Sequence, residues 1–191
     1  MPPRILAFAG SLRKESYNKK LVKIAANAAQ SAGAKVTLID LRDYPLPIYD
    51  GDIEAASGIP ENGLALKKLF IEHDGLLLAC PEYNSSITAV LKNTLDWVSR
   101  PQAGEPSLAA FTGKTAVLMS ASPGALGGLR GLVHVRSILG NINVLVLPQQ
   151  LAISKAHEAF NDDGTLKDAK QQAGIENLGK SLADILKKLT A

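Results

Sequence analysis

The fold is decided by Arg4-Ile5-Leu6-Ala7-Phe8-Ala9-Gly10-Ser11-Leu12-Arg13-Lys14-Glu15-Ser16-Tyr17-Asn18. An uninterrupted apolar run that ends at a glycine predicts a short buried strand over residues 4–9. Hydroxyl, amide and guanidinium side chains then crowd the start of the next predicted helix. Because the first turn of a helix has unpaired N–H groups and the positive end of the dipole, this junction favours an anion.

The rest of the chain repeats this alternation of strand and helix. Further strands are expected at 35–41, 75–80, 114–120 and 143–147. All except 35–41 are continuous apolar runs, typical of parallel strands covered on both faces, and the mixed run 35–41 suits an edge. Helical spacing marks 17–32 and four later segments containing Leu66–Phe70, Ile87–Val98, Leu129–Leu139 and Leu178–Leu189.

Five repeats of strand and helix predict an α/β fold. Right-handed crossovers favour a three-layer sandwich around a five-stranded parallel sheet of order 2-1-3-4-5, the flavodoxin-like arrangement. Residues 44–60, which are rich in Pro, Gly and Asp, are expected to form one long surface loop.

Length and composition fit a single soluble domain over residues 1–191, with 46% hydrophobic and 20% charged residues. No apolar run reaches the ~20 residues that span a bilayer, and the start shows no signal-peptide pattern, so no membrane insertion is expected. A single cysteine, Cys80, suits a cytoplasmic location. A net charge of +3 from scattered basic residues argues against binding to nucleic acid.

Ligands of open α/β sheets bind beyond the carboxyl ends of the strands, where the strand order reverses. The loop after the first strand lies there and lacks the G-x-G-x-x-G spacing, which favours a terminal phosphate over a dinucleotide pyrophosphate. The alternative is that Ser16 only caps the helix. The candidate phosphate ligands are Ser11, Arg13, Ser16 and Asn18.

Two further loops lie at strand ends. Pro81-Glu82-Tyr83-Asn84-Ser85-Ser86 follows the third strand and offers amides and an aromatic ring to a planar ligand, or is an ordinary turn in which Ser85 or Ser86 caps a helix. After the fourth strand, glycines would let the backbone approach a ligand closely. The candidates there are Ser122, Gly124, Gly127 and Gly128, and Arg130, which follows them, is either an assisting or a solvated side chain.

Other kinds of site are not supported by spacing. Gly113-Lys114-Thr115 lacks the first glycine of a P-loop because Leu108 occupies its place, and no G-x-S-x-G hydrolase elbow occurs. Three histidines and one cysteine lack metal-ligand spacing, so no metal is expected. We expect His73 to be structural and Cys80 to be an inert buried thiol.

The chain resembles the NAD(P)H-dependent FMN reductase family, the flavodoxin-like group of bacterial chromate, quinone and azo-dye reductases. Three segments carry the resemblance: Gly10-Ser-Leu-Arg-x-x-Ser-x-Asn18, Pro81-Glu-Tyr-Asn84 with Leu91-Lys-Asn-x-Leu-Asp-Trp97, and Ser122-x-Gly-x-x-Gly-Gly-x-Arg130. It covers at least residues 4–150. One departure is Ser85-Ser86, where relatives often carry glycine or one serine.

The resemblance implies that FMN is the cofactor and NAD(P)H the co-substrate. It places the phosphate on the first loop and the ring against residues 81–84 and the glycine loop. Electrons would pass to a small-molecule acceptor such as a quinone, chromate, an azo compound or free flavin, with no catalytic side chain and Glu82 supporting its loop. Relatives are cytoplasmic homodimers or homotetramers, and Trp97, Val98 and the fourth helix are either interface or core residues.

Two alternatives stay open at the level of sequence. One is a non-enzymatic flavodoxin-type electron carrier, for which an acidic docking face is expected, so a pI near 8.9 argues against it. The other is a flavin-free regulatory or binding module, because a fold alone does not fix a function.

Overall fold

A computed structural model describes residues 1–189 and is built around a five-stranded sheet of order β2-β1-β3-β6-β7. All neighbouring strands in this sheet are parallel. In chain order these strands have the predicted arrangement 2-1-3-4-5, which confirms the flavodoxin-like α/β fold and the edge position of the second strand. The strands are β1 (Arg4–Ala9), β2 (Lys35–Leu38), β3 (Gly75–Ala79), β6 (Thr115–Ala121) and β7 (Leu145–Ile153).

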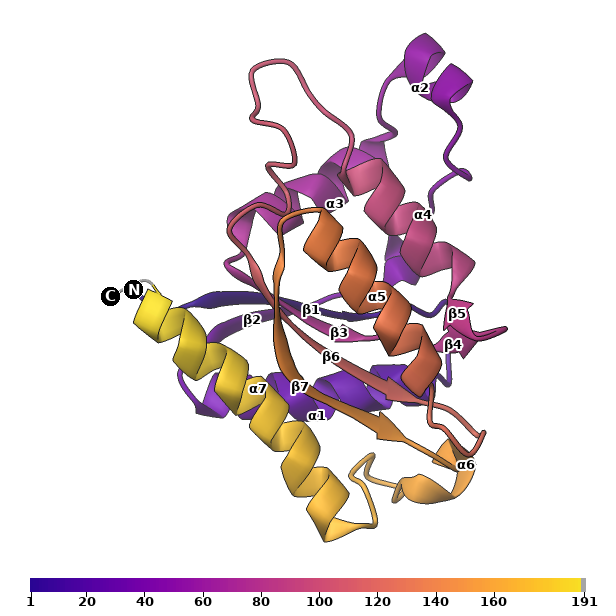
Figure 1. Ribbon diagram of the computed structural model, residues 1–191, viewed down its shortest axis with the longest axis vertical. Coiled ribbons are helices and arrows are strands. Elements are labelled where there is room, and N and C mark those ends of the chain that lie inside the picture. Colours follow the sequence, from indigo (N-terminus) through magenta and orange to yellow (C-terminus); the bar gives the residue numbers. More distant parts are fainter. Residues whose placement is uncertain (190–191) are drawn as a thin grey trace.

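Helices cover both faces of the sheet, so that the molecule has three layers (Figure 1). Alternate residues of β1 belong to two separate cores: Ile5 and Ala7 to one, Leu6 and Phe8 to the other. This two-sided burial is the reason why the strand is a continuous apolar run. The first core is closed by α1 (Tyr17–Ser31) and α7 (Ala169–Leu189), and the second by α3 (Glu61–Glu72), α4 (Ala89–Val98) and α5 (Leu129–Asn141).

The two edge strands differ in length from the predictions. β2 ends at Leu38, and Asp40 then accepts a hydrogen bond from the N–H of Arg42, which starts the 3-10 helix η1 (Leu41–Asp43). β7 runs six residues beyond the predicted end at 147, with a register shift opposite Ala116 and Leu118 of β6. Pro148 indicated an end of the strand, because a proline cannot donate a hydrogen bond to a neighbouring strand, but it is tolerated on an edge strand such as β7.

The predicted loop at 44–60 contains a short helix, α2 (Gly51–Ser57), that projects from the body of the molecule (Figure 1). We call residues 45–58 the arm. None of the residues of α2 is buried. The base of the arm is anchored to α4, because the indole N–H of Trp97 donates to the carbonyl of Pro47 at 2.8 Å.

Trp97 and Val98 are fully buried within their own chain, so the core alternative is confirmed for both residues and the interface alternative was wrong. A two-stranded hairpin, β4 (Glu82–Tyr83) and β5 (Ser86–Ile87), follows β3, and the four-residue helix α6 (Ala156–Ala159) follows β7; the sequence predicted neither. Within residues 1–189, no helix combines the length and the apolar character that a membrane crossing requires.

Candidate functional site

The loops after β1, β3 and β6 meet around a cavity of about 60 Å³. Tyr17, Ala121 and Pro123 also line this cavity and were not singled out, although each lies directly beside a predicted residue. Asn84, Gly124, Gly127 and Gly128 are not among its lining residues. The predicted residues that the fold brings together here are Ser11, Arg13, Ser16, Asn18, Pro81, Glu82, Tyr83 and Ser122.

The first loop is fixed largely by its backbone, and the hydroxyl of Ser11 accepts a hydrogen bond from the N–H of Arg13 at 3.2 Å, which leaves its own O–H free to donate. The Gly10 N–H donates to the carbonyl of Ala79, and a Cβ at Gly10 would lie 3.0 Å from the Cβ of Leu91. Ser16 stands at the N-cap of α1 with extended backbone, yet its side chain makes no capping hydrogen bond. The capping alternative for Ser16 was therefore wrong.

These unpaired donors fit a phosphate. The Ser11 and Ser16 side chains are nearly buried, each residue being 4% exposed, and no acidic residue lies in the first turn of α1. Within residues 1–189, Arg13 makes no ion pair that would occupy its guanidinium. Buried hydroxyls, a free guanidinium and a helix N-terminus are groups that can together hold a doubly charged anion.

Asn18 has a different environment from that expected of a phosphate ligand. Its Nδ2 donates to the carbonyl oxygen of Ala121 at 2.8 Å, and its Oδ1 accepts from the N–H of Ala121 at 3.0 Å. The side chain therefore joins the first loop to the end of β6. Sequence alone shows the residue type but not this partner on a distant strand.

The second loop is a hairpin rather than a helix cap. Asn84 and Ser85 have φ angles of 50° and 65°, so both central residues of the two-residue turn are left-handed, as in a type I′ turn. Thr88, not Ser85 or Ser86, is the N-cap of α4, and its hydroxyl also donates to the carbonyl of Gly10 at 2.6 Å. Tyr83 is 54% exposed at the rim of the cavity.

The glycines of the third loop serve the chain's own packing. A Cβ at Gly127 would lie 2.7 Å from the backbone of Ile153, and one at Gly128 would lie 2.8 Å from the Oγ of Ser120. Both residues have positive φ angles, 63° and 95°. The chain's own packing therefore explains why glycine is needed at both positions, whereas the sequence suggested close approach of a ligand. A Cβ at Gly124 would meet only the Ser122 hydroxyl, at 3.7 Å.

One carboxylate, that of Glu82, and one guanidinium, that of Arg130, link the β4–β5 hairpin to the first turn of α5. The Nη2 of Arg130 donates to the Oε1 of Glu82 at 2.7 Å, so Arg130 is paired rather than merely solvated. Burial alone would raise the pKa of the Glu82 carboxyl, but hydrogen bonds from Arg130 and Gly131 and the charge of Arg130 outweigh it and lower that pKa. Glu82 therefore remains ionised and supports its loop, as expected.

The titratable residues set aside by the sequence have structural environments. Complete burial raises the pKa of the Cys80 thiol to about 12, which makes it unreactive. His73 contacts the carbonyl of Leu69 and the hydroxyl of Thr37 through its two ring nitrogens. Both roles agree with the predictions for these residues.

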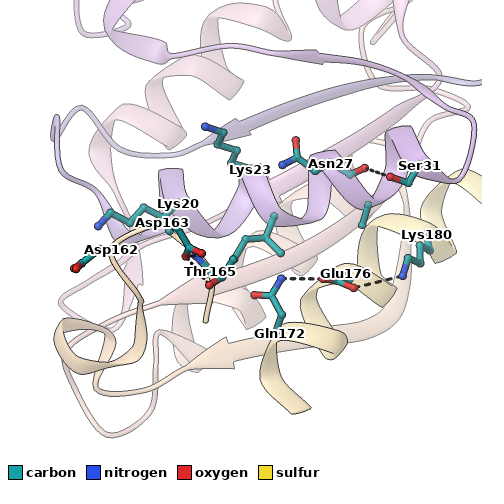
Figure 2. Close-up of a pocket in the computed structure, with 13 residues that line it drawn as sticks. Lys20, Lys23, Asn27, Ser31, Asp162, Asp163, Thr165, Gln172, Glu176 and Lys180 are labelled. Carbon is teal, nitrogen blue, oxygen red and sulfur yellow. Dashed lines mark hydrogen bonds and ion pairs between the residues drawn. The ribbon is translucent and has the colours of Figure 1, made fainter. Parts of the chain in front are cut away.

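A second cavity, of about 500 Å³, lies between α1, α7 and residues 162–165 (Figure 2). Several polar groups in it are paired with one another: Gln172 donates to Glu176 at 2.8 Å, and Lys180 contacts the same carboxylate at 3.4 Å. Neither the β3 loop nor the β6 loop contributes to its lining. It is larger than the cavity at the strand ends, but the strand ends where open α/β sheets bind their ligands do not line it.

A family model described as NADPH-dependent FMN reductase matches residues 3–158. The chain belongs to this family. It is 36% identical to an NAD(P)H-dependent FMN reductase of Pseudomonas aeruginosa, over 91% of this chain and 89% of that relative. It is 34% identical to a 2-hydroxy-1,4-benzoquinone reductase of a Burkholderia species, over 85% and 84% of the two chains.

Among solved structures, the fold resembles FerB of Paracoccus denitrificans, a flavoenzyme NAD(P)H:(acceptor) oxidoreductase. The TM-score is 0.78 with 27% identity, and the match covers 97% of this chain and 98% of that structure. Membership of the FMN reductase family makes this chain an FMN-dependent NAD(P)H oxidoreductase. The expected cofactor and enzyme class are confirmed, and the electron-carrier alternative is not favoured.

Proposed function

We propose that the cavity at the strand ends binds the FMN phosphate and that the hairpin and the glycine loop flank the flavin ring. One observation carries this proposal: the nearly buried hydroxyls of Ser11 and Ser16 lack an acidic neighbour in the first turn of α1 and stand beside the unpaired Arg13. When bound, FMN supplies the redox chemistry, accepting electrons from NAD(P)H and passing them to an acceptor.

The protein's own groups bind and orient. Ser11 and Ser16 donate to phosphate oxygens, and Arg13 adds a charge-assisted hydrogen bond. Asn18 holds the first loop to β6, and one N–H of its amide stays available to the phosphate. Pro81, Glu82 and Tyr83 line the cavity on one side, and Ser122 lines it on the other. Asn84, Gly124, Gly127 and Gly128 lie in the same two loops but not in the cavity lining, and these loops would flank the ring beyond the phosphate.

We propose a quinone as the principal acceptor, with chromate, azo compounds and free flavin as further candidates. The relative from Burkholderia bears the name of a benzoquinone reductase. The half-exposed ring of Tyr83 at the rim offers an aromatic surface to a planar acceptor. Because the flavin carries the redox step, we assign no side chain of this chain as a general acid or base.

We further propose that the enzyme is a homodimer or homotetramer. Leu129 and Val133 lie four residues apart on α5 and are 43% and 59% exposed, which gives this helix an unpartnered apolar surface. The arm carries a seven-residue helix in which no residue is buried, and so short a helix is marginal in water without further contacts. A second copy of the chain would cover both.

The single domain and the cytoplasmic location are also proposals. Leu182 and Leu186 of α7 share a core with Ile5 of β1, which supports one FMN-binding domain over residues 1–191. A single buried cysteine suits a reducing compartment.

The decisive experiment is steady-state turnover by the purified protein. Mixed with NADPH, NADH and 1,4-benzoquinone, the FMN-loaded enzyme should oxidise the nicotinamide without an added reductase. Bound FMN without any turnover would instead support an electron carrier. For the assembly, sedimentation should give more than one copy per particle, and Val133→Glu should lower that number; a monomeric wild type would contradict the proposal.

A further inference from the structure

The β4–β5 hairpin is too short to hold its own shape. Only two residue pairs, Glu82 with Ile87 and Tyr83 with Ser86, are in antiparallel register. An isolated two-stranded hairpin is marginal in water even when it is longer. The position of this hairpin must therefore come from contacts outside it.

Those contacts are made with α5. Glu82 is the first residue of the hairpin, and its side chain is 8% exposed. Its Oε1 accepts from Nε and Nη2 of Arg130 at 2.9 and 2.7 Å, and its Oε2 accepts from the N–H of Gly131 at 3.1 Å. The carboxylate thus meets a guanidinium edge-on and also pairs an otherwise free N–H in the first turn of α5.

The close approach of the two elements needs a glycine. A Cβ at Gly131 would lie 3.2 Å from the carbonyl oxygen of Ser86 and 3.4 Å from the Cβ of Glu82. On the other side of the hairpin, the Nδ1 of His134 lies 2.8 Å from the Ser86 hydroxyl. Both strands of the hairpin are therefore tied to the same helix.

The same helix continues from the glycine loop. Gly128 is its N-cap residue, and the Ser120 hydroxyl fixes the preceding turn by donating to the carbonyl of Gly127 at 2.7 Å. Glu82 consequently connects the hairpin, on one side of the proposed ring site, to the start of α5, which directly follows the glycine loop on the other side.

We propose that Glu82 is a positioning residue whose carboxylate, through Arg130 and the N–H of Gly131, sets the spacing between the hairpin and the glycine loop. This inference rests on the proposed placement of the ring between those two segments. It assigns Glu82 no direct contact with the cofactor. Arg130, which is 58% exposed, acts as the second half of the same contact.

The test compares FMN with riboflavin, which has the ring but no phosphate. In Glu82→Gln, one amide oxygen can still accept from Arg130, but the N–H of Gly131 loses its acceptor. We expect the Kd of the apoprotein for FMN and for riboflavin to rise by the same factor, about tenfold, which corresponds to ~1.4 kcal/mol. A matched control is Glu176→Gln, which alters another paired carboxylate on α7 and should leave both constants unchanged.

Arg130→Gln tests the same contact from its exposed side. It should raise both dissociation constants, and the double variant should resemble Glu82→Gln alone, because the two substitutions remove one interaction. Additive effects would show that the two side chains act on flavin binding independently of each other. With FMN saturating, iodide should quench the flavin fluorescence more strongly in Glu82→Gln than in the wild type.

Two results would overturn the proposal. Unchanged constants in Glu82→Gln would show that the carboxylate does not set the ring site, and weaker binding of FMN alone would place its effect at the phosphate end. Failure of the underlying proposal is distinguishable, because the wild-type protein itself would then bind neither flavin at the strand ends, and Arg13→Ala would leave the affinity for FMN unchanged.

Discussion

Asn18 and Ala121 exchange two hydrogen bonds, with the amide of Asn18 pairing both the N–H and the carbonyl of Ala121 at 3.0 and 2.8 Å. The amide of Asn18 therefore pairs the backbone of the last residue of β6 as a neighbouring strand would. This pair fixes the first loop of the site relative to the third.

Asn18→Ala should destabilise the protein by about 1–3 kcal/mol, because it leaves a buried N–H and a buried carbonyl of Ala121 unpaired. Urea denaturation followed by circular dichroism measures this free energy of unfolding. Asn27→Ala changes an exposed asparagine of the same helix and should stay within ~0.5 kcal/mol of the wild type. Equal stability of the two variants would contradict the bridging role of Asn18.

Arg13→Ala should weaken binding of FMN by ~1.5–3 kcal/mol, the contribution of a hydrogen bond to a charged group. Since Arg13 is exposed, the free energy of unfolding of the apoprotein should hardly change. Fluorescence titration of the apoprotein with FMN measures the affinity. Lys14→Ala, at the exposed neighbouring position, provides the control, and an equal loss in both variants would point to general charge instead of a specific phosphate contact.

Gly127→Ala should cost about 1–3 kcal/mol of stability, because it places a Cβ against the backbone of Ile153 at a left-handed φ angle. Gly124→Ala in the same loop meets no atom nearer than 3.7 Å and should be nearly neutral. Thermal unfolding of the two apoproteins compares them directly. A tolerated alanine at 127 would refute the packing explanation for this glycine.

Cys80 predicts a dependence of stability on alkaline pH. Its pKa is raised from 9.0 to about 12 in the folded protein, so unfolding releases a proton from the thiol between these values. The stabilisation is complete below pH 9 and is lost as pH rises, at up to ~1.4 kcal/mol per pH unit. The free energy of unfolding should therefore fall more steeply above pH 9 in the wild type than in Cys80→Ala; parallel curves would disprove the linkage.

The central sheet could be predicted because burial on both faces leaves a clear pattern. β1, with Ile5 and Leu6 in different cores, must be apolar at every position, and the same holds for β3. The edge strands were predicted less well, since β7 is partly exposed and contains Pro148. The β4–β5 hairpin could not be predicted from the sequence, because its strands have only two residues each. Its turn, Asn84-Ser85, also lacks the glycine that is typical of such turns.

For the site, the sequence predicted that three loops meet at one edge of the sheet, which the structure shows, but it did not predict the partners of their side chains. Ser11 and Ser16 could be found because polar residues after a buried strand are conspicuous. The pairing of Glu82 with Arg130 depends on how a hairpin lies against a helix, which no local pattern reports. Gly127 looked like a place for a ligand, and only the position of β7 reveals that the chain itself fills that space.

The arm has a consequence for how such enzymes diverge. Because α2 contributes no side chain to either core, its sequence can drift without loosening the sheet that carries the site. The anchor of Pro47 on Trp97 keeps the base in place while the tip varies. Substitutions at the exposed positions of α2 should therefore leave the free energy of unfolding of a single chain nearly unchanged and act on the proposed contact with a second copy. Related enzymes can thus differ there in how their copies pack together while keeping the same sheet.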